Sequence, residues 1–434
     1  MLIKHIIAGI LVLTLSLGQA SIIFAESEIM EEPTAQITET SGLADYLRIG
    51  LERNPELKVL FHEWKASTYK ISKEFSLPDP QFSYTDYSEE SDKQEAYSFS
   101  QMIPWPEKLW IKKNRAAIGS DEAHFRFLAR RLEIIRQITE AYYEYAYLSK
   151  AVLITGENMK LLKNFEGVAQ AKYASGLTKN QDLLKIQVEL GILENELTSM
   201  EDMRYPLMAR LIALLSLSEE TRLPWPSDSL EDAAMSADYE DVGLLIKKIQ
   251  NHNPELAASE KNVNGEKQEL RLAKRSYIPD FMVTLTQEKM RPTTMGNQED
   301  PWMIMFSVNV PLWFGRINAE VQEARASLLA AEAGQENKSN ELESMLSMTH
   351  YKLRDALRQS RLYKDALIPK AVQALNATKS AYEAGSMDFL SLIDAQRVLL
   401  DFQMAYYRHN ANFYQMLTEI QALIGDTTVL QNEE

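Results

Sequence analysis

The sequence predicts a mainly α-helical protein in which one unit, made of a helix, a β-hairpin and a long helical hairpin, occurs twice. The stretch Tyr173–Leu190 returns as Tyr382–Leu399, with tyrosine, glycine, leucine and glutamine at matching positions. Long segments with few prolines surround both copies, and only four short segments alternate as strands do. We therefore expect two structural repeats, at 26–226 and 227–425, and a C-terminal tail at 426–434.

Shorter motifs recur in the same order and support a duplication. The pairs are Asn54-Pro55-Glu56-Leu57 with Asn253-Pro254-Glu255-Leu256, Pro78-Asp79 with Pro279-Asp280, and Phe99-Ser100 with Phe306-Ser307. Chance matches would not keep this order along the chain. We infer that the two halves descend from one unit.

Composition excludes several classes of function. A net charge of −16 disfavours a nucleic-acid partner, because nothing offsets phosphate repulsion. The chain has no cysteine, which excludes disulfides and thiolate metal sites. It also lacks a phosphate-binding glycine-rich loop, a His-Glu-x-x-His motif and a Gly-x-Ser-x-Gly motif. We predict a protein that is not an enzyme and that has no cofactor.

Residues 1–25 have the pattern of a secretory signal peptide. Lys4 and His5 precede the apolar run Ile6–Leu17, and cleavage is expected after Ala20 or Ala25. The alternative is an N-terminal membrane anchor, but the apolar run is shorter than the ~20 residues that a membrane-spanning helix needs. We expect the mature chain to be exported.

The first elements of each repeat are a helix and a β-hairpin. Leu43–Ser76 has a helical apolar face and is followed by prolines. Residues 81–87 and 95–103 then alternate with period two, and Phe281–Gln287 with Trp302–Val310 form the second copy. Tryptophans flank these strands, at Trp105, Trp302 and Trp313. Such residues suit a membrane–water boundary, and ordinary packing between strand and helix is the alternative.

A long helical hairpin completes each repeat. Leu109–Tyr173 would be about 100 Å long as one helix, and Ile317–Tyr382 would be similar, with a kink at Pro369. The chain then turns and returns as Gln181–Ser216 and Leu390–Ile424. At the turns we expect left-handed Gly176 and Gly385, with Thr178 or Ser386 capping the next helix.

Four strands per chain constrain any membrane-bound form. A four-stranded sheet has two open edges, and hydrocarbon offers no hydrogen-bond partner for the backbone groups of these edges. Several chains would therefore have to combine their strands. Two chains would pool eight strands, whose side chains nearly fill the barrel, whereas three would pool twelve and leave a lumen. A trimeric duct is the simplest solution. A periplasmic coiled-coil adaptor or scaffold is the alternative, but it leaves the two hairpins unexplained.

The ordered motifs resemble the TolC family of outer-membrane efflux ducts. They are Asn54-Pro55-Glu56-Leu57, Phe99–Pro106, Val310–Gly315, Tyr382–Gly385 and Ile393–Gln396, and the Pro-Trp-Pro and Pro-Leu-Trp-Phe-Gly versions most resemble the heavy-metal efflux branch. The resemblance implies a homotrimer in the outer membrane of a Gram-negative bacterium, with a 12-stranded β-barrel continued by a long α-helical barrel in the periplasm. It implies passive conduction from an inner-membrane pump of the resistance–nodulation–division type and a periplasmic adaptor. A type I secretion duct would have the same fold.

The resemblance also implies roles for residues of the two turns. The adaptor-docking tips would be Ser175, Gly176, Leu177, Ala384, Gly385 and Ser386, and the periplasmic gate would contain Asp394, Asp182, Tyr382 and Ser391. Asp394 matches an acidic ring that attracts cations. Two positions depart from the family: Ser391 stands where some relatives have an acid, and Met387 replaces an arginine of the closed-state latch.

Methionines gather in the second hairpin. They are Met282, Met290, Met295, Met303 and Met305. Thioether sulfur is a ligand for copper(I). The alternative is that these side chains fill gaps or face lipid, so we predict no metal site.

Overall fold

A computed structural model describes residues 37–38, 40–89, 91–176, 180–226, 230, 241–292 and 299–426. The predicted signal peptide, Leu177, Thr178, Met295 and nearly all of the predicted tail lie outside these residues. No helix within the described ranges is both long enough and apolar enough to cross a membrane.

The same order of elements occurs twice along the chain. The first series is α2 (Leu43–Arg53), α3 (Pro55–Phe75), β1 (Gln81–Asp86), β2 (Lys93–Ile103), α4 (Pro106–Ala174) and α5 (Asn180–Leu215). The second is α6 (Val242–His252), α7 (Pro254–Arg275), β3 (Asp280–Met290), β4 (Trp302–Asn309), α8 (Phe314–Leu362), the π-helical turn η1 (Tyr363–Leu367), α9 (Ile368–Glu383) and α10 (Phe389–Leu423). The limits of the two repeats stay a prediction, since the segment joining them is largely undescribed.

The expectation of one helix over Leu43–Ser76 is wrong. The helix breaks at Asn54, whose side chain accepts hydrogen bonds from the backbone N–H groups of Glu56 and Leu57 at 2.9 and 3.2 Å. Pro55 then occupies the start of α3. A residue before proline is disfavoured in the helical region, whereas proline is well suited to a first turn. The repeated Asn-Pro motif is therefore a signal to stop one helix and start the next.

The predicted long helices are confirmed. Helix α4 runs without interruption for 69 residues, about 100 Å at the usual helical rise. In the second copy, the π-helical turn η1 comes just before Pro369, where a kink was expected. A proline removes one backbone hydrogen bond and crowds the preceding turn, so the helix widens at this point.

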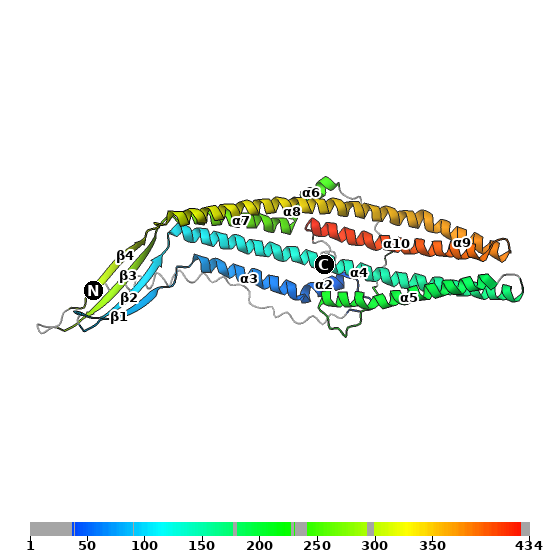
Figure 1. The fold of residues 1–434 in the computed structure, drawn as a ribbon, viewed down its shortest axis with the longest axis horizontal. Coiled ribbons are helices and arrows are strands. Elements are labelled where there is room, and N and C mark those ends of the chain that lie inside the picture. The colour runs from blue at the N-terminus through cyan, green and yellow to red at the C-terminus, as the bar shows by residue number, and fades with distance from the viewer. Residues whose placement is uncertain are drawn as a thin grey trace. The chain divides into compact units, whose positions relative to one another are not determined.

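The shorter helices lie against the long ones (Figure 1). Helix α4 contacts α3, α5, α7 and α10, and α8 contacts α7 and α10. The start of α7 lies beside the end of α10. There the Asn253 side-chain amide donates a hydrogen bond to the Leu423 carbonyl at 2.9 Å. Tyr142 and Tyr145 of α4 are fully buried.

The four predicted strands form one antiparallel sheet in the order β1-β2-β3-β4. Because β2 pairs with β3, the two halves share this sheet, and β1 and β4 are its edges within the chain. The helical tips lie at the other end of the long helices (Figure 1).

The register gives the sheet two different faces. One face, called here the apolar face, carries Phe82, Tyr84, Tyr97, Phe99, Ile103, Phe281, Val283, Leu285, Trp302, Ile304, Phe306 and Val308. Its polar members are Gln101 and Gln287 and, farther from the helices, Asp86, Glu95 and Lys289. The other, called the polar face, carries mainly hydroxyl, amide and methionine side chains, including Gln81, Ser83, Thr85, Ser98, Ser100, Thr284, Thr286, Glu288, Ser307 and Asn309. Such a division is typical of a sheet that separates two different solvents.

Candidate functional site

Both helical hairpins turn at a glycine, as predicted. Gly176 and Gly385 have φ values of +69° and +75°, which disfavour a residue with a Cβ. Their N–H groups donate to the carbonyls of Tyr173 and Tyr382 at 2.9 and 3.1 Å. The tip residues Ser175, Gly176, Ala384, Gly385 and Ser386 are exposed, so they form a surface that a partner could reach.

Ser386 does not cap α10, contrary to expectation. Its hydroxyl and its N–H both donate to the Ala381 carbonyl, so this residue closes α9 instead. The cap of α10 is Asp388, whose carboxylate accepts from the Ser391 N–H at 3.1 Å and from its hydroxyl at 2.6 Å. The donation from Ser391 lowers the pKa of Asp388. Ser391, placed in the gate by resemblance, therefore serves the helix start in this chain.

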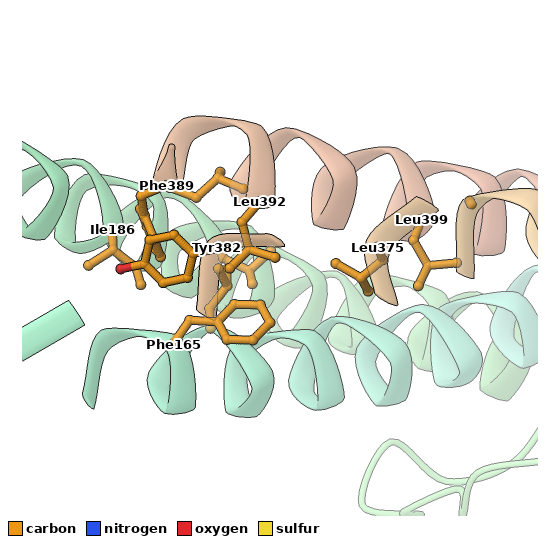
Figure 2. Close-up of a cluster of buried hydrophobic side chains, with 11 residues drawn as sticks. Phe165, Ile186, Leu375, Tyr382, Phe389, Leu392 and Leu399 are labelled. Carbon is orange, nitrogen blue, oxygen red and sulfur yellow. The ribbon is translucent and has the colours of Figure 1, made fainter. Parts of the chain in front are cut away.

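A buried cluster joins the two hairpins behind the tips (Figure 2). Tyr382 and Phe389 meet edge to face, with ring centroids 5.2 Å apart. Phe165 of α4 and Ile186 of α5 pack into the same cluster, so all four tip helices contribute. Phe389 is fully buried. Both turns are therefore supported by one shared hydrophobic cluster.

Lys172 connects the end of α4 with the end of α9. Its ammonium donates to the Tyr382 carbonyl at 2.6 Å and to the Glu383 carbonyl at 3.4 Å. The same nitrogen lies 4.1 Å from the centre of the Tyr382 ring. A cation near the C-terminal carbonyls of a helix is favoured by the helix dipole. Sequence reasoning missed this contact, although a lysine near the tip was a usable signal.

Arg397 connects the two returning helices. Its guanidinium donates twice to the Glu189 carboxylate of α5, at 2.6 and 3.2 Å. Such two-point pairing fixes geometry better than a single contact. Glu189 follows Gly176 in the sequence at nearly the same spacing at which Arg397 follows Gly385. This match of opposite charges could have predicted the ion pair.

A charge exchange tests this ion pair. Arg397→Glu is expected to loosen the tips, because it sets two carboxylates against each other, and to speed backbone hydrogen exchange of the tip residues about fivefold, or ~1 kcal/mol. Glu189→Arg combined with Arg397→Glu restores the pair and should restore the slow exchange, as measured by mass spectrometry. A double variant that exchanges as fast as the single one does would contradict this role.

The remaining predicted gate residues lie near these contacts. Asp182 is in the first turn of α5 and partly buried, and Asp394 is exposed on α10, one turn before Arg397. Burial raises the pKa of the Tyr382 phenol, and the nearby Asp182 carboxylate raises it further. The structure thus brings Asp182 and Tyr382 together at the tips. The gating roles of these residues stay predictions.

The three predicted interface tryptophans lie at opposite ends of the sheet. Trp105 and Trp313 occupy the starts of α4 and α8, where strands β2 and β4 pass into helices. Trp302 begins β4 at the end farther from the helices. Trp313 is 77% exposed, so packing between strand and helix does not account for its presence. Trp105 is less exposed and lies near Phe281, with ring centroids 6.1 Å apart.

Within the described ranges, no group of three or more histidine, aspartate or glutamate side chains is arranged to hold a metal ion.

Comparison with known proteins agrees with this architecture. Residues 245–426 match the family model described as outer membrane efflux protein. The chain is 23% identical over 381 residues to the cobalt-zinc-cadmium resistance protein CzcC of Cupriavidus metallidurans, covering 86% of this chain and 81% of that protein. It is 20% identical over 343 residues to the outer membrane protein TolC of Vibrio cholerae, covering 76% and 75%.

Solved structures show the same fold. The outer membrane protein VceC of Vibrio cholerae superposes with a TM-score of 0.70 at 17% identity, covering 88% of this chain and 96% of that one. A CusC structure gives 0.72 at 12% identity, covering 91% and 96%. The match to the family model thus identifies residues 245–426 as an outer membrane efflux protein region, and the chain as a whole has the fold of the solved outer membrane channels.

Proposed function

We propose that this outer-membrane efflux channel works as a homotrimer whose pooled strands close a 12-stranded β-barrel. The observation that carries the proposal is the apolar face of a sheet whose edges, β1 and β4, have no pairing partner among the described residues. Phe306 and Ile304 on that face are 77% and 62% exposed, which is costly in water and favourable in lipid. Strands β2 and β3 have 11 residues each, about the 9–11 that a tilted transmembrane strand needs.

The tryptophans fit the two boundaries of such a barrel. Trp105 and Trp313 would lie at the periplasmic boundary and Trp302 at the outer one, because aromatic residues gather where lipid meets water. The apolar face would then contact outer-membrane lipid, and the polar face would line the lumen.

The helices would continue the duct toward a partner in the periplasm. The exposed tips around Gly176 and Gly385 would dock a periplasmic adaptor, and an inner-membrane pump of the resistance–nodulation–division type would supply the substrate. The similarity to CzcC supports heavy-metal cations as that substrate. The pump would select the cation, and the duct would conduct it passively.

Purification and conductance test this function. The protein should sediment with outer membranes, resist carbonate extraction, migrate as a detergent-solubilised trimer and conduct ions in planar bilayers. A monomer that is soluble without detergent would contradict the proposal and favour a periplasmic scaffold.

The acidic gate can be tested separately. Asp394→Ala is expected to weaken block by divalent cations at the periplasmic end about tenfold, equal to ~1.4 kcal/mol, because each copy removes one carboxylate from the ring. Asp401→Ala, an equal change at an exposed position farther along α10, is the matched control. Unchanged block and selectivity in Asp394→Ala would remove the assigned role.

A further inference from the structure

All the methionines of the described strands lie on one face of the sheet. Pairing places Met102 opposite Met282, and Met282 opposite Ser307. Met305 and Met303 lie opposite Thr284 and Thr286, which share that face. Met290 follows at an even spacing along β3, so it points to the same side.

This segregation overturns one explanation for the methionines. If they faced lipid, they would share the apolar face with Phe99, Leu285 and Phe306, but that face has none in the described strands. They lie instead among hydroxyl groups. Met102 and Met305 are 43% and 47% exposed, so they do not fill gaps in a core.

The neighbouring hydroxyls bond to each other. Ser100 and Thr284 are hydrogen-bonded at 2.9 Å, and Ser98 and Thr286 at 3.0 Å. Each pair thus satisfies a donor and an acceptor across the two strands. The thioether sulfurs beside them are weak acceptors with no strong hydrogen-bonding role, which leaves them available as soft ligands.

The spacing allows adjacent sulfurs to share one ion. Directly opposed residues such as Met102 and Met282 have Cβ atoms about 4.5–5.5 Å apart, and diagonal neighbours such as Met282 and Met305 are about 7–8 Å apart. Met303 lies two residues from Met305 along β4, about 7 Å. The sulfurs therefore form a series from the helical end of the sheet toward its far end.

We propose that these methionines bind a soft monovalent cation, copper(I) or silver(I), on the luminal face of the barrel. Neutral thioether sulfur is suited to copper(I), and it needs no deprotonation in the lumen. Conduction requires sites that hold an ion weakly enough to release it to the next one, and spaced thioethers meet that requirement. The inference rests on the proposed function, because only a closed barrel makes this face a lumen.

Calorimetric titration of the purified, detergent-solubilised channel with silver nitrate in chloride-free buffer tests the site. Silver(I) is the probe because it shares the soft character of copper(I) and is stable in air. The triple variant Met102→Leu/Met282→Leu/Met305→Leu should bind silver at least about tenfold more weakly than the natural chain. Leucine keeps a similar volume, so the fold should persist.

The control is Met203→Leu/Met387→Leu, which changes exposed methionines outside the sheet. Silver affinity of this variant should equal that of the natural chain. Equal affinity in the triple variant, or no silver binding by the natural chain, would overturn the proposal.

Conductance in potassium nitrate separates this site from the channel function. The natural channel should be blocked by micromolar silver(I), whereas the triple variant should conduct normally and resist the block. A natural protein that does not conduct would contradict the channel proposal alone, because the titration still decides whether the methionines bind silver. Equal block of both channels would count against the methionine site.

Discussion

Lys172→Met is expected to open the periplasmic tips and raise the basal conductance of the channel by about 10- to 100-fold. The Lys172 ammonium holds the Tyr382 and Glu383 carbonyls, so it fastens the first hairpin to the second. Hydrogen bonds to a charged group contribute about 1.5–3 kcal/mol, which corresponds to this range in an equilibrium. Methionine keeps most of the apolar stem and removes the charge, so packing against Tyr382 should survive.

Single-channel recording at low ionic strength measures the effect. Lys163→Met, at an exposed position of the same helix, removes the same charge and should leave conductance near that of the natural channel. An equal increase in both variants would show that net charge, and not the contact with α9, sets the conductance. No change in Lys172→Met would show that the tips are held by other contacts.

The prediction also bears on a departure from the family. Met387 stands where the resemblance implies an arginine of the latch, and it is exposed at the tip. In this chain Lys172 and Arg397 are cations near the tips that bond across the two hairpins. The conductance of Lys172→Met therefore tests whether such a contact acts as the latch.

Local pattern was sufficient to predict most of the fold. Period-two alternation located the four strands, and the scarcity of proline located α4, because both signals depend only on neighbours in sequence. The break between two helices at Asn54 was not predicted, although asparagine before proline satisfies both the capping and the proline rules. The repeated Asn-Pro motif therefore indicates a helix boundary as well as a duplication.

The tip contacts could not be predicted in the same way. Lys172 meets Tyr382 across 210 positions, and Arg397 meets Glu189 across 208. These separations match the duplication, but which side chains face each other depends on how the two hairpins rotate against each other. The facing of Met102 likewise depends on the pairing of β2 with β3, which no local pattern determines.

Phe306→Arg is expected to prevent stable insertion of the proposed barrel, whereas Ser307→Arg should be tolerated. The two residues are adjacent on β4, so alternation puts Phe306 on the apolar face and Ser307 on the polar face. An arginine facing lipid near the middle of the bilayer costs about 2–4 kcal/mol, and in a trimer this cost arises in every copy. The same arginine in a lumen stays hydrated.

Refolding into phospholipid vesicles across a urea series measures the difference. The midpoint of Phe306→Arg should fall well below that of the natural chain, and that of Ser307→Arg should stay close to it. Both variants introduce the same arginine at nearly the same depth in the membrane, so they differ mainly in the face of the sheet that carries it. If both variants insert equally well, the apolar face does not meet lipid; if Ser307→Arg alone fails, the two faces are assigned the wrong way round, and the methionines face the bilayer.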